Sequence, residues 1–169
     1  MFIQSLNLVK IELGYEAFHA VILGNEQGRN LYKKKLMQLT EQYHLTNQIK
    51  FIDHCKDMAL AYKISDIVIS PSIEPEAFGR VAVEAQSMEK LIIASNIGGS
   101  NETIIDGKTG LLFEAGDPNS LSKRIIQAVT LDESSYKRMG KEGRKNIAKK
   151  FNVEKMCFST YSEYKRLLN

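Results

Sequence analysis

The stretch Ser65–Gly110, SDIVISPSIEPEAFGRVAVEAQSMEKLIIASNIGGSNETIIDGKTG, decides the fold of this chain. Its apolar, β-branched runs Asp66–Ser70 and Leu91–Ala94 are typical of buried strands, and the pattern over Phe78–Met88 is helical. A strand, a helix and a second strand in this order form a unit of parallel sheet. The stretch therefore predicts an α/β fold in which the turns after both strands lie at one edge of the sheet.

The same alternation of strands and helices continues on both sides of this stretch. Asp117, followed by Pro118, and Asp132 are predicted N-caps of two further helices in a helical C-terminal third. Other strands are predicted at 19–23, 48–52 and 110–113, and other helices at 2–13, 28–44, 58–63, 101–105 and 153–168. The pattern predicts one domain over residues 1–169, a doubly wound parallel sheet flanked by helices.

The first predicted element does not suit such a sheet. Phe2, Leu6, Val9 and Leu13 recur at helical spacing, and Gly14 is placed to end the helix. A doubly wound unit should open with a strand, which here would have to be supplied by something else. We therefore expect the sheet to lack its first strand.

Composition excludes several other classes of protein. The 169 residues are 43% hydrophobic and 25% charged, with 3 prolines, which fits a globular domain that needs no disulfide or metal. No segment approaches the roughly 20 apolar residues of a membrane span. Polar residues interrupt the N-terminus, so we expect no signal peptide and a cytoplasmic protein. Cys55 and Cys157 form no C-x-x-C pair and are expected to be buried or inert thiols.

The small net charge of +3 is concentrated near the C-terminus. Residues 132–150 hold seven basic and three acidic side chains, more net positive charge than the whole chain carries. No aromatic residue lies between Lys137 and Lys150, which argues against nucleic-acid binding by base stacking. The stretch is either a solvated helix face or a docking surface for an anionic membrane or an acidic partner.

Two carboxylates lie at the predicted start of the helix over 78–88. The unpaired N–H groups of a helix start favour phosphate, and Gly79 allows close approach of a ligand to the backbone. Glu76 precedes this helix and Glu84 lies within it, so the two could hold two hydroxyl-bearing parts of one ligand. A second glycine-rich turn, Ser95–Ser100, follows the next strand. It is either part of the ligand site or a structural turn.

The segment Glu76–Glu84, EAFGRVAVE, resembles the E-x7-E signature of retaining glycosyltransferases of the GT-B fold, specifically glycosyltransferase family 4. The surroundings resemble that family in the same order, with Ser70-Pro71-Ser72 before the motif and Ala94-Ser95, Gly98-Gly99, Glu102, Asp106–Leu112 and Asp117-Pro118 after it. The resemblance covers residues 1 to 168 and implies a Rossmann-like, nucleotide-sugar-binding domain, the C-terminal half of a GT-B enzyme.

The resemblance also implies roles for individual residues. Glu76 would be catalytic and contact the transferred sugar, and Glu84 would contact the ribose of the donor. The remaining donor-binding residues would be Phe78, Gly79, Arg80, Gly98 and Gly99. The implied reaction moves a sugar from a nucleotide sugar, with retention, to a lipid-linked or polysaccharide acceptor in cell-envelope, capsule or lipopolysaccharide biosynthesis. No metal or other cofactor is expected, and the enzyme would work in the cytoplasm, at the inner face of the membrane.

The chain departs from the family pattern in ways that predict a partner. The half with the acceptor site is absent, as is the basic Arg and Lys pair that usually precedes the opening helix. Smaller departures are Asp53, Glu89 and Leu91. We expect an N-terminal GT-B half on another chain, and an exposed apolar face on the last helix to meet it. The alternatives are a catalytically idle nucleotide-binding remnant and, at lower weight, a nucleotide-sugar epimerase of the same fold.

Overall fold

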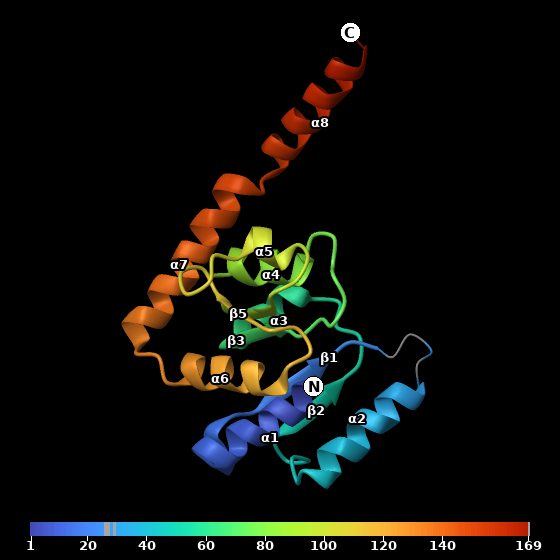
Figure 1. Cartoon of the computed structure of the whole chain (residues 1–169), viewed down its shortest axis with the longest axis vertical. Coiled ribbons are helices and arrows are strands. Elements are labelled where there is room, and N and C mark those ends of the chain that lie inside the picture. Colours follow the sequence, from blue (N-terminus) through green and yellow to red (C-terminus); the bar gives the residue numbers. More distant parts are fainter. Residues whose placement is uncertain (26–27, 29, 169) are drawn as a thin grey trace.

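The computed structural model describes residues 1–25, 28 and 30–168 (Figure 1). Every strand and helix predicted from the sequence is present within about three residues of its predicted ends, although Arg29, in the predicted helix 28–44, lies outside the described residues. In chain order the elements are α1 (Phe2–Leu13), the 3-10 helix η1 (Tyr15–Ala17), β1 (Ala20–Leu23), α2 (Asn30–Gln42), β2 (Ile49–Ile52), α3 (Met58–Ile64), β3 (Ile67–Ser70), α4 (Arg80–Ser87), β4 (Leu91–Ser95), α5 (Ser100–Thr103), β5 (Leu111–Phe113), α6 (Pro118–Val129), α7 (Glu133–Lys150) and α8 (Val153–Leu168).

The parallel strands form two sheets. β1 pairs with β2, with Ala20 opposite Ile49. In the second sheet β4 lies between β3 and β5, with Ile67 opposite Leu91 and Ile93 opposite Leu111. Every residue of β4 is buried, as expected of a central strand covered on both faces. The α/β architecture with parallel strands and flanking helices is the predicted one, and the division into two sheets is the feature that the strand patterns alone did not predict.

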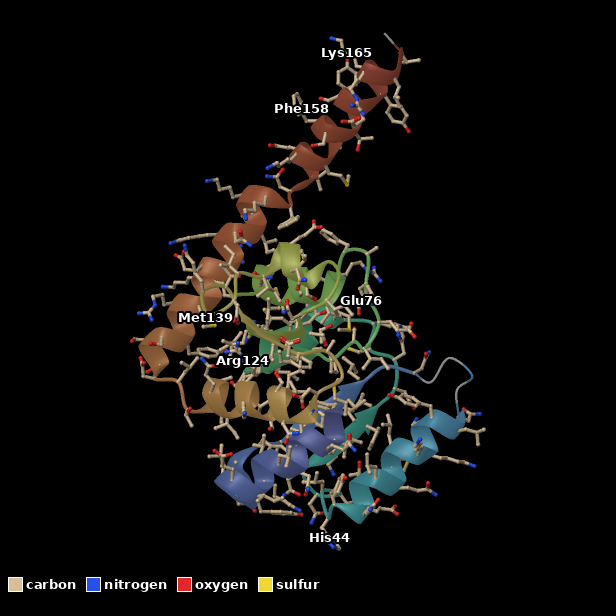
Figure 2. All side chains as sticks on the ribbon, in the orientation of Figure 1. His44, Glu76, Arg124, Met139, Phe158 and Lys165 are labelled. Atoms are coloured by element: carbon tan, nitrogen blue, oxygen red, sulfur yellow. The ribbon has the colours of Figure 1, made fainter. Side chains whose placement is uncertain are left out.

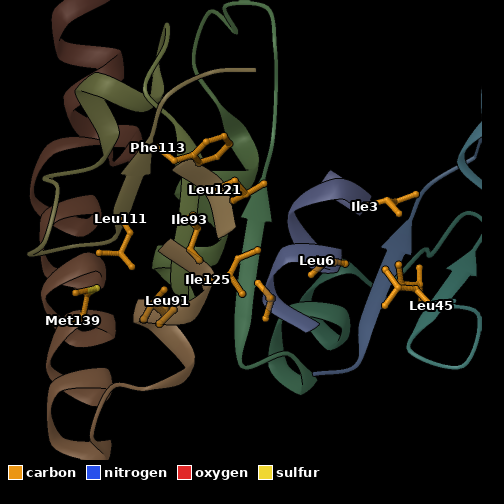
Figure 3. Packing of buried hydrophobic residues seen from close by; sticks show 13 residues of the cluster. Ile3, Leu6, Leu45, Leu91, Ile93, Leu111, Phe113, Leu121, Ile125 and Met139 are labelled. Atoms are coloured by element: carbon orange, nitrogen blue, oxygen red, sulfur yellow. The ribbon is translucent and has the colours of Figure 1, made fainter. Parts of the chain in front are cut away.

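The hydrophobic core lies on both faces of the larger sheet. Successive side chains of a strand point to opposite faces, so Ile93 joins one cluster and Ile92 the other. The larger cluster brings α1 and α6 against both sheets, and Figure 3 shows Leu121 and Ile125 of α6 between the strand residues Leu91 and Ile93 on one side and Ile3 and Leu6 of α1 on the other. The smaller cluster contains Tyr62 of α3 and Ala82 and Ala85 of α4. Helices α3 and α4 therefore cover the face opposite α1.

Helix caps form as predicted. The Asp117 carboxylate accepts a hydrogen bond from the backbone N–H of Asn119 at the start of α6, and that of Asp132 accepts from Ser135 N–H at the start of α7. Hydrogen bonds from the Ser134 and Ser135 groups lower the pKa of Asp132 below its ordinary value, because they stabilise the carboxylate. All seven basic side chains of the C-terminal positive stretch are exposed on α7, as expected: Lys137, Arg138, Lys141, Arg144, Lys145, Lys149 and Lys150.

Helix α8 projects away from the rest of the protein (Figure 1). It contains no buried residue among those described, which confirms the predicted exposure of its apolar face. The exposed apolar side chains are Val153, Met156, Phe158, Tyr161, Tyr164, Leu167 and Leu168. Both cysteines are free thiols: Cys55 is half-buried, and Cys157 is exposed because it lies on this projecting helix, so of the two predicted alternatives, buried or inert, burial does not hold for Cys157. Within the described residues, no helix has the length and apolar character needed to cross a bilayer.

Helix α7 packs against α4 and the turn that follows it through Gly140 and Gly143, and this contact gives a test of the fold. A Cβ added to Gly140 would overlap the carbonyl oxygen of Glu89, which ends the α4 turn. Gly140→Ala would stabilise a solvated helix, but here we expect the free energy of unfolding to fall by about 1–3 kcal/mol through overpacking. Urea denaturation measures the change.

The control for this variant is Lys141→Ala, which changes an exposed neighbour on the same helix and should stay within about 0.5 kcal/mol of the parent. A Gly140→Ala protein as stable as the parent, or more so, would show that α7 does not pack on α4 in this way.

Candidate active site

Two glycine-rich loops meet at the carboxyl ends of β3 and β4. The backbone N–H of Gly99 donates a hydrogen bond to the carbonyl oxygen of Glu76 at 2.8 Å. Gly98 has a φ of +58°, and a Cβ there would lie 2.6 Å from the same carbonyl oxygen, so the position requires glycine. A Cβ on Gly99 would lie 2.6 Å from the carbonyl carbon of Phe78. The glycines thus allow two backbones to touch, which supports the structural interpretation of this turn, and its ligand-binding role stays a prediction.

The contact between the loops borders an open hollow of about 600 Å³. Its lining residues are Pro75, Glu76, Ala77, Gly98, Gly99, Asn101 and Glu102. The Glu76 side chain is exposed, and its Oε1 accepts a hydrogen bond from the hydroxyl of Ser72 in the same loop. Figure 2 shows Glu76 on this loop, on the side of the protein away from α7. A carboxylate held at one oxygen in this way can accept hydrogen bonds from a hydroxylated ligand at the other.

The N-terminus of α4 lies beside the second glycine loop, since a Cβ on Gly79 would lie 3.8 Å from the backbone nitrogen of Ser100, but Phe78, Gly79 and Arg80 are not among the residues that line the hollow. Gly79, the N-cap, is buried with φ +73° and ψ +59°, a left-handed conformation that favours glycine. No side chain caps this helix among the residues described, so its first N–H groups remain available to a ligand. The side chain of Arg80, the first residue of α4, is exposed. Uncapped N–H groups, the helix dipole and a guanidinium together favour an anion such as phosphate.

The second predicted carboxylate, Glu84, lies one turn further along α4 and outside the residues that line the hollow. Its Oε2 accepts a hydrogen bond of 2.7 Å from the hydroxyl of Tyr62 on α3. Burial raises the pKa of the Tyr62 hydroxyl, and its hydrogen bond to Glu84 and the negative charge of that carboxylate raise it further. The opposing effect of the Arg80 charge is smaller. Tyr62 therefore stays protonated and fixes the orientation of the Glu84 carboxylate.

Sequence reasoning missed Tyr62. The residue lies 22 positions before Glu84, in a helix predicted from apolar spacing, where a tyrosine is an ordinary core residue. The residue is 6% exposed and packs with Ala82 and Ala85 of α4, and its hydroxyl donates to Glu84. No residue pattern in this chain would have distinguished it from a purely structural aromatic residue.

Side-chain hydrogen bonds support the second glycine loop through α5. Gln86 of α4, which is fully buried, donates from Nε2 to the carbonyl oxygen of Thr103, the last residue of α5. Asn146 of α7 donates to the same oxygen, and the Thr103 hydroxyl donates to the carbonyl oxygen of Gly99. The rings of Phe78 and Phe151 meet edge to face, with centroids 5.7 Å apart. The hydrogen bonds join the second glycine loop, through α5, to α4 and α7, and the aromatic contact joins the first loop to the C-terminus of α7.

Other charged residues near α4 and β2 lie away from the hollow. Lys90 donates to the carbonyl oxygen of Lys63 at the end of α3, and Arg144 donates to that of Ser87 at the end of α4. Asp53 pairs with Lys33 at 2.7 Å beyond β2. Of the basic residues considered, Arg80 is the one at the start of α4. In the described part of the chain no three His, Cys, Asp or Glu side chains cluster as metal ligands would, and the expectation of a metal-free site stays a prediction.

Comparison with known proteins finds relatives that are all described as glycosyltransferases. The family model described as "Glycosyl transferases group 1" matches residues 1–146. A capsular polysaccharide biosynthesis glycosyltransferase of Staphylococcus aureus, CapM, is 28% identical over 166 residues, which cover 98% of this chain and 42% of that protein. The crystal structure of a glycosyltransferase from Rickettsia africae matches with a TM-score of 0.91 at 31% identity, over 99% of this chain and 44% of that one.

A third relative was crystallised with a nucleotide. The structure of Anabaena Alr3699/HepE in complex with UDP matches with a TM-score of 0.85 at 25% identity, over 96% of this chain and 44% of that one. The chain thus spans less than half the length of these three relatives.

The contact between Tyr62 and Glu84 gives the test of this geometry. Tyr62→Phe keeps the ring and removes the hydroxyl that donates to the carboxylate. We expect the free energy of unfolding to fall by about 1 kcal/mol, because Glu84 is half-buried and water replaces part of the lost bond. The matched control is Tyr164→Phe on α8, where the exposed hydroxyl should contribute nothing measurable in the same denaturation experiment. Equal effects of the two substitutions would contradict a structural role of this hydrogen bond.

Proposed function

The chain belongs to the group 1 glycosyl transferases, and we propose that it is the donor-binding half of such an enzyme, transferring sugar from a nucleotide sugar with retention of configuration. The observation that supports this most is that Glu76 and the Gly98-Gly99 turn line one hollow, next to the loop that leads into the uncapped start of α4. A nucleotide sugar presents a diphosphate beside a ring of hydroxyls, and these three features match those two groups.

The proposal assigns a role to each part of the site. The α4 N-terminus and Arg80 meet the negative charge of the diphosphate, and Gly79 lets it approach the backbone. Gly98 and Gly99 shape the opposite wall, beside the backbone amide of Phe78. Glu76 accepts hydrogen bonds from the hydroxyls of the transferred sugar and acts as the catalytic residue.

Glu84 holds the ribose, since its Oε2 is engaged by Tyr62 and its other oxygen accepts no hydrogen bond from any residue that the structure describes. The reaction needs no metal in this proposal, because positive helix ends and a guanidinium stabilise the departing diphosphate instead.

The acceptor side of the proposal follows from the relatives. The Staphylococcus protein is named for capsular polysaccharide biosynthesis, and we infer a lipid-linked or polysaccharide acceptor in cell-envelope, capsule or lipopolysaccharide synthesis for this chain as well. Such acceptors place the enzyme at the inner face of the membrane, in the cytoplasm. The exposed basic face of α7 is the surface that would lie near anionic lipid.

We further propose that transfer requires a second half. The hollow is open, and the chain spans 42% of CapM and 44% of the two crystallised relatives. The apolar face of α8 extends outside the body of the protein and suits packing against a partner half. The isolated chain is then expected to bind donor and not to transfer sugar.

Calorimetry tests donor binding directly. We expect one of UDP, GDP and ADP to bind the chain, and Glu84→Ala to weaken this nucleotide by about ten- to a hundredfold, because hydrogen bonds to a charged group contribute about 1.5–3 kcal/mol. Glu41→Ala, an exposed position on α2, is the matched control and should bind like the parent. No binding of any of the three at millimolar concentration would favour the alternative, an idle remnant.

Sugar transfer is tested by adding the missing half. The chain is mixed with a candidate N-terminal half, and transfer from a labelled nucleotide sugar is followed. We expect activity in the mixture alone and a loss of roughly a hundredfold or more with Glu76→Gln, which keeps the shape of the side chain and removes its charge. Activity that survives Glu76→Gln would contradict the catalytic role, and no transfer in any combination would contradict the enzyme proposal.

A further inference from the structure

The hollow beside Glu76 has a negatively charged lining. Two of the residues that line it, Glu76 and Glu102, carry carboxylates, and a third, Asn101, carries a neutral amide. The other lining residues are proline, alanine and glycine, so no basic side chain of the described residues belongs to the lining. Glu102 lies outside the E-x7-E segment and is not among the donor-binding residues that the family resemblance implies. The charge of the hollow therefore depends in part on a residue that the motif does not include.

One glycine holds both carboxylate-bearing residues in place. The backbone N–H of Gly99 donates to the carbonyl oxygen of Glu76 at 2.8 Å, and the carbonyl oxygen of Gly99 accepts from the backbone N–H of Glu102 at 3.2 Å. Glu76 and Glu102 are thus attached through their backbones to the two sides of the same peptide. Gly98 and Gly99 contribute no side chain that could separate the two carboxylates.

The short helix α5 that carries Glu102 is itself fixed to the core. Thr103, the next residue, is fully buried, and its hydroxyl donates to the carbonyl oxygen of Gly99. Its own carbonyl oxygen accepts from Gln86 of α4 and from Asn146 of α7. The position of Glu102 at the hollow is therefore a property of the packed structure.

Both carboxylates can interact with a ligand. Glu76 and Glu102 are exposed, and the Ser72 hydroxyl donates to only one oxygen of Glu76. The Glu102 carboxylate accepts no hydrogen bond and forms no ion pair with any residue that the structure describes. A ligand in the hollow thus meets carboxylate oxygens that accept hydrogen bonds and cannot donate any.

Positive charge lies outside the hollow. Arg80 is at the start of α4 and does not line the hollow, and in the donor site proposed here its guanidinium meets the diphosphate. Lys90 and Arg144 are engaged elsewhere, with the carbonyl oxygens of Lys63 and Ser87. The site is therefore divided into a part that favours anions, at the start of α4, and an acidic part, in the hollow.

We propose that the hollow selects the charge of the transferred sugar: it accepts an uncharged, hydroxyl-bearing sugar ring and rejects a sugar that carries a carboxylate, such as a hexuronic acid. Glu102 is the residue that adds this specificity to Glu76. The inference rests on the proposed function, because it takes the sugar of a nucleotide-sugar donor to lie beside Glu76, and it adds the class of sugar and one residue to that proposal.

The physical reason is a difference between two donors that share their nucleotide. The hydroxyls of a neutral sugar donate hydrogen bonds to Glu76 and Glu102. A uronic acid is ionised at pH 7, so its carboxylate has no hydrogen to donate and meets two like charges with no cation in the hollow to pair with. The diphosphate and the base bind equally in both donors, so the difference in affinity comes from the sugar alone.

Calorimetry on the whole chain tests the selection with matched donors. The probes are UDP, UDP-glucose and UDP-glucuronic acid, or, where the nucleoside diphosphate titrations select another base, GDP with GDP-mannose and GDP-mannuronic acid, or ADP with ADP-glucose and ADP-glucuronic acid. We expect the uronic acid donor to bind about tenfold or more weakly than the neutral donor at low salt. At 1 M salt the screening length is about 3 Å, so this ratio should shrink severalfold.

A substitution assigns the effect to Glu102. Glu102→Gln keeps the shape of the side chain and removes its charge, and we expect the ratio of the two affinities to fall by about threefold or more, through tighter binding of the uronic acid donor. Binding of the nucleoside diphosphate alone is the internal reference, because it lacks the sugar. The matched control is Glu41→Gln, an exposed carboxylate on α2, which should leave the ratio at its parent value.

The outcomes separate this inference from the proposed function. Binding of the nucleoside diphosphate together with equal affinities for the two sugar donors, or with a preference for the uronic acid, overturns the charge selection and leaves the donor site standing. A ratio that is unchanged both at 1 M salt and in Glu102→Gln shows that shape, and not charge, discriminates, and also overturns it. No binding of any nucleotide or donor contradicts the donor site, and the inference fails with it.

Discussion

The close contact between two backbones, Glu76–Phe78 and Gly98-Gly99, is the constraint on which the rest of the site depends. A side chain at either glycine would collide with the facing backbone, so the two loops can approach only with glycine at both positions. The hydrogen bond from Gly99 to the Glu76 carbonyl fixes the register of that approach. Glu76 is positioned by this contact, and residues of both loops line the hollow beside it. The requirement for glycine at positions 98 and 99 therefore couples the loop after β4 to the Glu76 carboxylate on the loop after β3.

Helix α4 connects this contact to the core. Its apolar face packs on the sheet through Ala82 and Ala85, and its far side receives α7 at Gly140 and Gly143. The buried Gln86 amide extends the same support to α5. Tyr62 adds a fixed hydrogen bond to Glu84 from α3. The two carboxylates thus differ in their surroundings. Glu76 lies on a loop open to solvent, which suits the reacting role proposed for it, and Glu84 is held on a helix, which suits the proposed role of orienting the donor.

The sequence was sufficient for the elements and for the motif, and it failed where the structure depends on contacts between distant segments. Periodicity located β3, α4 and β4, because the apolar run of a parallel strand and the spacing of a helix are local properties. Gly98 and Gly99 were identifiable as a turn from the sequence. Their contact with the Glu76 loop depends on how the two successive strand-to-helix units pack against each other, which no local pattern encodes. Tyr62, Gln86 and Asn146 look like ordinary helix residues, and the exposure of Cys157 follows from the course of α8, which no local pattern encodes.

Helix α4 carries the charge of the site at one end and the packing of α7 along its length. Ligands of doubly wound sheets bind at the carboxyl ends of the strands, and the residues that line the hollow follow β3 and β4. Arg144 of α7 is engaged at the far end of α4, where it donates to the Ser87 carbonyl oxygen. The C-terminus of α7 reaches the start of α4 through an apolar contact, between the rings of Phe151 and Phe78. Attraction of an anion to the start of α4 therefore depends on the helix itself, through its uncapped N–H groups and the guanidinium of Arg80.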